Sequence, residues 1–216
     1  MQLYHVLNRG VDKRKIFLDN RDRARFVHDL WEFNAEENPQ NVRRRLGMTG
    51  LRNPSSLPIV DLHGWCIMGN HYHLLLSERA GGGLTKFIRR LNVGYANYFN
   101  LRNRRTGTLF EGRTKKILIE RESHFLYILH YIHLNPLDFV PDAREWRNGA
   151  IGAPSKALDY LATYRWSSYL DYCGNTNFPS VLTNELFSNV FKDYRKELSS
   201  YVSSLKGDLT MSYELE

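Results

Sequence analysis

Cysteine is nearly absent from this sequence, since Cys66 and Cys173 are the only two among 216 residues. Two thiols are too few for a disulfide framework or a cysteine-based zinc site. No run approaches the roughly eighteen apolar residues of a transmembrane helix, and the N-terminal MQLYHVLNRG has no apolar stretch behind a basic start. A P-loop string is also missing. We therefore expect a cytoplasmic protein with no membrane partner.

Acidic residues are in deficit. The chain has 30 Lys and Arg against 23 Asp and Glu, which leaves a net charge of +7. Excess positive charge attracts polyanions, and nucleic acid is the usual one. The composition is otherwise ordinary, with 42% hydrophobic and 25% charged residues. This length and composition predict one globular domain with appendages.

The pattern of apolar residues and turn signals predicts the element order β-α-ββ-α-β-α. Runs of strand-forming residues lie at Tyr4–Leu7, Ile59–Met68, His71–Ser77 and Lys116–Ile119. Helical periodicity is found from about Arg21, over about Leu84–Asn100 and over about Ser123–Leu134. The first six elements match a ferredoxin-like, split βαβ layout. We expect an α+β fold, with an antiparallel sheet that carries helices on one face.

Two segments lie outside this layout. Residues 38–58 are rich in Gly, Pro, Asn and Ser around the Arg43–Arg45 cluster, which indicates an exposed insertion. Beyond about Val181, apolar residues at roughly helical spacing predict a helix that packs on the body or on a partner, or that contacts DNA.

Two histidines flank a tyrosine in the string His71-Tyr72-His73. On a strand, alternate side chains share a face, so both imidazoles point one way and Tyr72 points the other. Paired imidazoles form half of a site for a divalent metal, and a further ligand must come from elsewhere in the chain. A chain with 8 histidines also produces such a pair by chance.

The helix HFLYILHYIHLNP carries Tyr127, Tyr131 and Asn135 at intervals of four residues, so they share one face. The Asn135 amide oxygen is a suitable metal ligand. A tyrosine beside a metal that polarises a phosphate becomes a nucleophile for phosphoryl transfer. Core packing is the competing interpretation of such tyrosines.

Basic residues are concentrated in and before the loop that precedes the last strand. Positive charge with interleaved aromatics such as Phe110 is typical of a surface for single-stranded nucleic acid. The candidate DNA-binding residues are Arg89, Arg90, Arg104, Arg105, Arg113, Lys115 and Lys116.

Four ordered strings, GNHYHLLL, RTGTLFEGR, YIHLNP and YRWSSY, resemble the HUH single-strand transposase superfamily. Within it the chain is most similar to the REP-associated tyrosine transposases, relatives of the small insertion-sequence transposases. The resemblance runs from Tyr4 to about Tyr172 and implies a catalytic domain over residues 1–172. Residues 173–216, beyond it, are expected to form a C-terminal helical extension or tail.

The resemblance also implies roles for individual residues. His71, His73 and Asn135 would be the ligands of Mg²⁺ or Mn²⁺, and Tyr131 would attack a phosphate of single-stranded, hairpin DNA. A 5′-phosphotyrosine link and a free 3′-OH would result, and reversal by another 3′-OH would rejoin strands without ATP. We expect the protein to act as a monomer or homodimer.

Alternatives remain for the nucleophile and for the function. Tyr127 lies one helical turn before Tyr131 on the same face and is its rival. A non-catalytic nucleic-acid-binding regulator derived from a transposase is the second function. A metal-dependent hydrolase that uses water as the nucleophile is the third.

The remaining histidines are given simpler interpretations. His5 and His63 lie in predicted strands and are expected to pack or to support neighbouring groups. His130 and His133 point away from the face that carries Tyr131.

Overall fold

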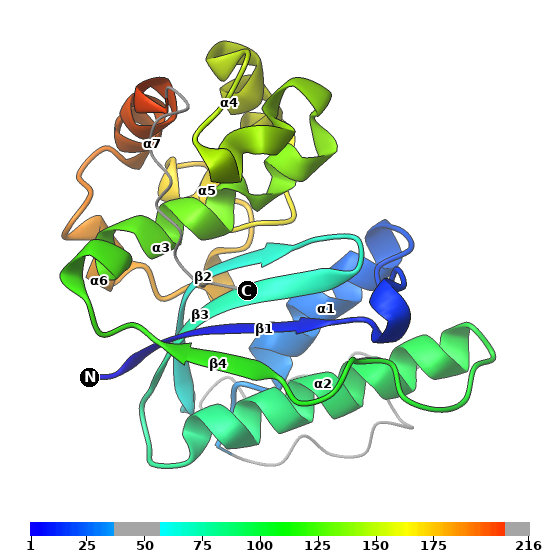
Figure 1. Cartoon of the computed structure of the whole chain (residues 1–216). Coiled ribbons are helices and arrows are strands. Elements are labelled where there is room, and N and C mark those ends of the chain that lie inside the picture. Colours follow the sequence, from blue (N-terminus) through cyan, green and yellow to red (C-terminus); the bar gives the residue numbers. More distant parts are fainter. Residues whose placement is uncertain (37–56, 206–216) are drawn as a thin grey trace.

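The structure, a computed structural model, describes residues 1–36 and 57–205. At its centre lies an antiparallel sheet of four strands in the order β2-β3-β1-β4 (Figure 1). The strands are β1 (Leu3–Arg9), β2 (Val60–Ile67), β3 (His71–Glu78) and β4 (Lys115–Leu118). Because β1 pairs with both β3 and β4, β1 and β3 are the two central strands.

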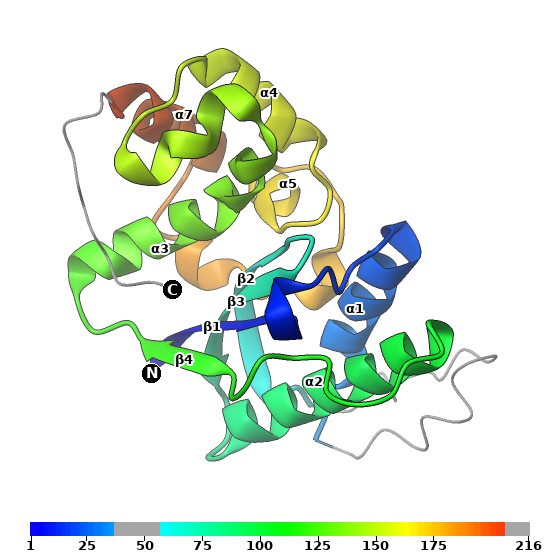
Figure 2. The same cartoon turned by 45° about the vertical axis from the view of Figure 1, so that its right-hand side comes forward.

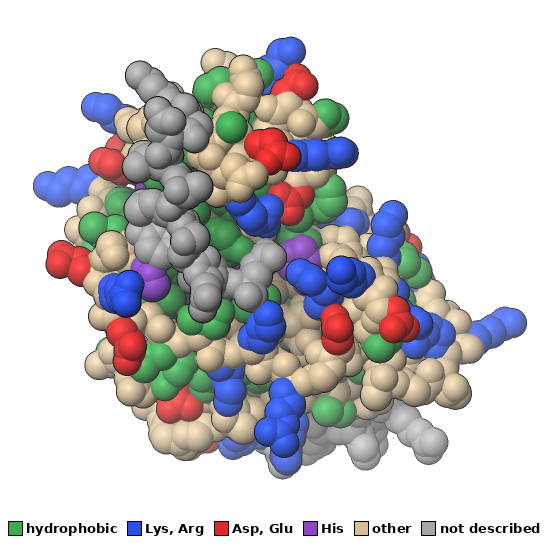
Figure 3. Space-filling model, in the orientation of Figure 1, with side chains coloured by type: hydrophobic (Ala, Val, Ile, Leu, Met, Phe, Trp, Pro, Cys, Tyr) green, Lys and Arg blue, Asp and Glu red, His purple; other side chains and the backbone are tan. Residues whose placement is uncertain are grey.

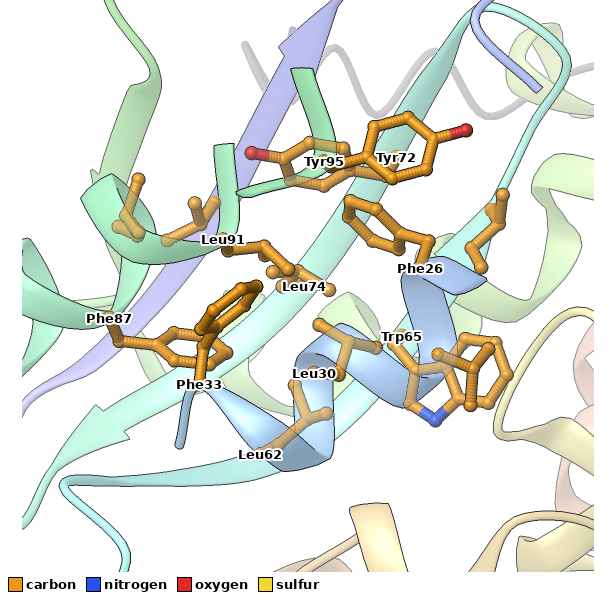
Figure 4. Close-up of a cluster of buried hydrophobic side chains, with 14 of the residues drawn as sticks. Phe26, Leu30, Phe33, Leu62, Trp65, Tyr72, Leu74, Phe87, Leu91 and Tyr95 are labelled. Carbon is orange, nitrogen blue, oxygen red and sulfur yellow. The ribbon is translucent and has the colours of Figure 1, made fainter. Parts of the chain in front are cut away.

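Helices α1 (Asn20–Glu32) and α2 (Gly83–Arg102) cover one face of this sheet (Figures 1 and 2). The expected start of α1 is confirmed, because the Asp19 side chain accepts a hydrogen bond from the backbone N of Asp22 and caps the helix. Between helices and sheet lies a cluster of buried side chains, dominated by aromatic and aliphatic groups (Figure 4). Phe26 of α1, Trp65 of β2 and Tyr95 of α2 are among its largest members.

Helix α3 (Glu122–Leu134) lies against the opposite face of the sheet (Figures 1 and 2). Its buried Leu129 and Ile132 belong to a second cluster, to which the sheet contributes Leu75. A Cβ atom at Gly64 would lie 2.9 Å from a Leu129 methyl carbon, closer than real Cβ contacts. Glycine at that point of β2 therefore allows α3 to approach the sheet closely.

The residues after α3 build the rest of this second layer. They form η3 (Asn135–Phe139), η4 (Pro141–Asn148), α4 (Pro154–Thr163), α5 (Tyr169–Tyr172), η5 (Pro179–Val181), α6 (Glu185–Ser188) and α7 (Tyr194–Ser204). Phe187 of α6 and Leu198 of α7 are fully buried in the cluster that contains Leu129. The C-terminal helices up to residue 205 therefore pack around α3, which is one of the three placements expected for this segment.

The α+β fold and the β-α-ββ-α-β-α order are confirmed. Helices α1 and α2 lie on one face as expected, and α3 adds a layer on the other. The physical reason is that the central strands are buried on both sides: Leu75 of β3 joins the cluster around α3, while Leu74 and Leu76 join the cluster around α1 and α2. Most of the expected insertion, residues 38–56, and the tail from 206 onward lie outside the described residues.

One further feature concerns membranes. Among the helices of the described ranges, none is long and apolar enough to cross a bilayer.

Candidate functional site

His71 and His73 project from β3 toward the layer that contains α3. Their ring centroids lie 4.9 Å apart with the ring planes nearly perpendicular. Tyr72, between them, points to the other face, where its hydroxyl donates to the Asn92 Oδ1 at 2.7 Å. Burial raises the pKa of Tyr72 well above its usual value. Strand alternation therefore places the two imidazoles together and excludes Tyr72 from the site.

His5 of β1 completes a group of three rings. Its Nε2 lies 2.9 Å from the His73 Nδ1, and the two rings stack with centroids 5.2 Å apart. Burial lowers the pKa of His5 to about 3, so this imidazole is neutral. We expected His5 to pack or to support a neighbouring group, and in the structure the group that it contacts is His73.

The second nitrogen of His73 is chemically informative. Its Nε2 is buried and has no hydrogen-bond partner among the described residues. A buried imidazole nitrogen without a partner is costly unless something binds it. Burial, followed by the neighbouring His71 and His5 rings and the cations Arg147 and Arg9, holds the pKa of His73 well below its ordinary value. A neutral, oriented imidazole of this kind fits a metal ligand.

The Asn70 side chain fixes the tautomer of His71. The Asn70 Nδ2 donates to the backbone oxygen of Lys13 at 3.1 Å, so its Oδ1 faces the His71 Nδ1 at 2.7 Å. Since an amide oxygen only accepts, His71 donates through Nδ1 and keeps the lone pair on Nε2. This is the nitrogen with which a histidine held in this way binds a metal.

Tyr131 of α3 lies directly over the histidine group. Its ring centroid is 5.8 Å from those of both His5 and His73, in edge-on contacts. The ring is buried, with 4% of its surface exposed. Tyr127, the rival, instead lies against Tyr131 and Tyr201, with centroid distances of 6.0 and 5.7 Å. Burial, with a contribution from Tyr201, raises the pKa of Tyr127 far above its usual range.

Asn135 is fully buried at the start of η3, and both ends of its amide are engaged. Its Nδ2 donates to the backbone oxygen of Tyr131 at 2.8 Å. Its Oδ1 accepts from the Arg147 guanidinium at 2.7 Å. The atom expected to bind a metal is therefore already in contact with a cation supplied by η4.

No family model and no curated protein matches this sequence. Among solved structures, the chain is similar to one described as a REP-associated tyrosine transposase bound to a REP hairpin. The TM-score is 0.50 at 11% identity, and the match covers 86% of this chain and 87% of that chain. The two proteins share a fold. The likeness predicted from the sequence motifs is thus confirmed at the level of the fold.

Another cluster of metal-ligating groups lies on α1. It consists of His28, Asp29 and Glu32, whose possible ligand atoms all lie within 4.8 Å of one another. Within residues 1–36 and 57–205, no other set of three or more His, Cys, Asp or Glu residues is gathered this closely. The Arg25 Nε donates to the Asp29 carboxylate at 2.8 Å, so part of this charge is already neutralised. Helix α1 covers the sheet face opposite His71 and His73, so this cluster is separate from the predicted site.

The predicted DNA-binding residues divide into two groups. Arg89, Arg104, Arg113, Lys115 and Lys116 are exposed, and Lys and Arg side chains gather over β4 and the adjacent part of α2 in Figure 3. Lys115 pairs with Leu7, which itself pairs with His73, so Lys115 lies on the histidine face at the sheet edge.

The other two predicted residues make internal bonds. Arg90 donates to the backbone oxygen of Ala35 at 2.6 Å, and Arg105 donates to the Asn100 Oδ1 at 2.5 Å. Both side chains hold chain segments together in this structure.

Two arginines were missed by the sequence reasoning. Arg9 pairs with His71 across β1 and β3, on the face that carries the histidines. Alternation along β1 places His5 and Arg9 on one face, but the pairing of β1 with β3 is a tertiary fact. Arg147, which contacts Asn135, has no local sequence signal for its role.

Proposed function

We propose that this chain is a metal-dependent strand transferase that cleaves single-stranded, hairpin DNA through a 5′-phosphotyrosine intermediate. One observation carries the proposal: the Tyr131 ring lies against the His73 ring at 5.8 Å, with His71 beside it on the same strand. A phenol next to two imidazoles is the donor set for metal-assisted phosphoryl transfer. The shared fold with a transposase bound to a REP hairpin supports the DNA substrate.

The residues present fit a divalent cation such as Mg²⁺ or Mn²⁺, because the buried His73 Nε2 lacks a partner among the described residues. His71 and His73 would hold it through Nε2, with Asn135 as the third ligand. A bound cation would polarise the scissile phosphate and stabilise the charge that develops on its oxygens.

The side chains of the protein carry out the remaining steps. The Tyr131 oxygen attacks phosphorus as its hydroxyl proton leaves, and the bond between phosphorus and the 3′ oxygen breaks. That oxygen takes up a proton and becomes a free 3′-OH, while the 5′ phosphate stays on Tyr131. Attack by another 3′-OH reverses the sequence and restores the phenol, so one phosphodiester replaces another and no ATP is required.

The exposed cations near β4 would bind the DNA backbone. Arg113 and Lys115 are adjacent to the sheet edge that carries the histidine face, so a strand held there reaches the site. Lys116 alternates to the opposite face, where its Nζ donates to the Thr85 Oγ1 at 3.4 Å. Arg89 and Arg104 would extend this path. Arg90 and Arg105 would join it only by exchanging their internal bonds for phosphate contacts.

A non-catalytic regulator that binds the same DNA is the second candidate. Two observations favour it: the Tyr131 side chain is buried, and the Asn135 oxygen is held by Arg147. A protein that only binds hairpins would show this arrangement permanently, whereas an enzyme must open it during turnover. A metal-dependent hydrolase that uses water as the nucleophile is the third candidate. The domain boundary after Tyr172 and action as a monomer or homodimer also stay predictions.

Incubation with hairpin oligonucleotides and Mn²⁺ tests the proposal. An oligonucleotide labelled at its 3′ end should become attached to the protein in a denaturant-resistant adduct, while a 5′ label leaves on a fragment with a free 3′-OH. Replacing both histidines by Ala should abolish the adduct and retain DNA binding. Binding without any adduct in the wild type would select the regulator, and cleavage without an adduct would select the hydrolase.

A further inference from the structure

Arg147 lies at the junction of the elements that form the predicted site. It comes from η4, and its guanidinium donates to the Asn135 Oδ1 at 2.7 Å and also to the Asp138 carboxylate. Its guanidinium carbon lies 4.3 Å from the centre of the Trp146 ring and 5.8 Å from that of Tyr131. This arginine therefore touches both the proposed nucleophile and the proposed third ligand.

The orientation of the Asn135 amide is determined by its partners. Its nitrogen donates to the Tyr131 carbonyl oxygen, and its oxygen faces a guanidinium. If the amide were flipped, its oxygen would face the Tyr131 carbonyl oxygen and its NH₂ group would face the guanidinium. Two acceptors and two donors would then oppose one another, so the observed orientation is the stable one. Only the oxygen is suitable for binding a cation, and Arg147 already occupies it.

A divalent cation and the guanidinium cannot share that oxygen at close range. Both would lie within bonding distance of one atom, and their repulsion in a partly buried site is large. Asp138 does not resolve the conflict, because its carboxylate already accepts from Arg147 and from the Trp146 Nε1 at 2.8 Å. Metal binding at Asn135 therefore requires Arg147 to move away.

Arg147 has room to do so. Its side chain is 31% exposed, in contrast to the buried Tyr131 and Asn135. It also lines a small pocket with Tyr127, Trp146 and Tyr201, so open space borders the residue. A guanidinium released beside Tyr131 is well suited to bind a phosphate, which it recognises with two parallel hydrogen bonds.

We propose that Arg147 is an exchangeable occupant of the Asn135 oxygen, and a catalytic residue that binds the scissile phosphate once a metal ion has displaced it. In the DNA-free protein it holds the third ligand position. In the loaded protein it is turned toward the phosphate that Tyr131 attacks. This inference rests on the proposed function, because it assigns a role to Arg147 within the same site.

The two roles of Arg147 predict effects of opposite sign in one variant. Arg147→Met keeps an unbranched side chain at this position and removes the charge that lies over the Trp146 ring. Mn²⁺ titrated into the DNA-free protein and followed by electron paramagnetic resonance should bind about tenfold tighter, because a nearby unit charge is lost. Adduct formation with a 3′-labelled hairpin should slow by a factor of about 100, as expected for a lost transition-state contact to phosphate.

Two further variants complete the design. Arg144→Met, at an exposed arginine of the same η4 segment, should leave both measurements unchanged. Arg147→Lys keeps the charge but cannot span Asn135 and Asp138, so its Mn²⁺ affinity and adduct rate should both lie between those of the wild type and Arg147→Met. Thermal unfolding shows which variants remain folded. If Arg147→Met does not fold, the Mn²⁺ affinity and adduct rate of Arg147→Lys are compared with those of the wild type instead.

The outcomes separate this inference from the proposed function. Unchanged or weaker Mn²⁺ binding in a folded Arg147→Met protein overturns the exchange, and an unchanged adduct rate overturns the phosphate role. Absence of Mn²⁺ binding from the wild type and from both Arg147 variants overturns the inference and the metal chemistry together. Binding that appears only when Arg147 is replaced supports the exchange.

Discussion

The Nε2 of His5 and the Nδ1 of His73 lie 2.9 Å apart across neighbouring central strands, and the two rings stack. If His73 binds a metal through Nε2, as proposed, its Nδ1 carries the hydrogen and donates to His5. The His5 Nε2 would then accept, so one hydrogen bond would fix both the tautomer and the orientation of the proposed ligand.

Replacing His5 by Phe should weaken metal binding without removing a ligand. The ring volume is retained and the hydrogen bond is lost, so we expect Mn²⁺ affinity to fall by about 10- to 100-fold. His5→Gln, whose amide supplies a polar partner for Nδ1, should restore part of the loss. Isothermal titration of the DNA-free protein measures both.

His63→Phe is the control for this prediction. It also removes a buried imidazole from the sheet, one whose Nε2 lies 2.7 Å from the Ser77 Oγ rather than near His73. Its Mn²⁺ affinity should match that of the wild type. Equal losses in the His5 and His63 variants would mean that the effect comes from general damage to the sheet.

DNA affinity should depend strongly on salt through the cations near β4. Each phosphate contact made by a cation contributes about 0.7 to the slope of log K against log salt for a single strand. Changing Arg113, Lys115 and Lys116 to Gln should therefore lower the slope by about 2. Fluorescence anisotropy with a labelled hairpin between low and moderate salt provides the measurement.

A triple variant of Lys156, Lys192 and Lys196 to Gln removes the same charge from the C-terminal half, where all three residues are exposed. It should keep the wild-type slope. If both triple variants lower the slope equally, the DNA path does not follow β4 and only net charge matters.

Acid should destabilise the protein through its buried histidines. Burial lowers the pKa of His130 to about 4, whereas the unfolded value is about 6.5. Below pH 6.5 the unfolded chain binds more protons, so stability that is complete above that pH is lost as the pH falls toward 4. For His130 the loss between pH 7.5 and 5.0 is about 2 kcal/mol.

Chemical denaturation at these two pH values tests the assignment with His130→Gln. Glutamine does not titrate but can still reach the Tyr194 hydroxyl, which lies 3.2 Å from the His130 Nδ1. The variant should lose about 2 kcal/mol less than the wild type on acidification. An identical loss in both proteins would assign the acid sensitivity to other groups.

Local patterns were sufficient to predict the elements and part of the site. Alternation on a strand placed His71 and His73 together and sent Tyr72 to the other face, because side-chain direction on a strand depends only on position. The face shared by Tyr127 and Tyr131 followed equally from helical spacing. The contact between Tyr127 and Tyr131, and those of Tyr131 with His5 and His73, agree with these expectations.

Tertiary pairing supplied what local patterns could not. His5 reaches His73 because β1 inserts between β3 and β4, and no spacing in the chain encodes that pairing. Arg147 reaches Asn135 because η4 folds back on η3. The exposure of a cation was also not predictable from its charge alone. Arg90 and Arg105 are partly buried and donate to oxygens within the protein, whereas Lys115 is exposed.

Identification of the tyrosine that becomes linked to DNA is the sharpest test of the proposed phosphotyrosine mechanism. Only one of Tyr131 and Tyr127 can serve, because they are separated by one helical turn and reacting atoms must come within about 3.5 Å. Tyr131 contacts the histidine group, whereas Tyr127 lies against Tyr201. Tyr131→Phe should keep its fold and hairpin binding, and Tyr127→Phe should keep substantial cleavage.

The decisive measurement is mass spectrometry of peptides from the Mn²⁺-dependent adduct of the wild type, together with adduct formation by both variants. We expect a nucleotide on Tyr131 and no adduct from Tyr131→Phe. A nucleotide on Tyr127, with an adduct that survives in Tyr131→Phe and is lost in Tyr127→Phe, would overturn the assignment of Tyr131 as the nucleophile.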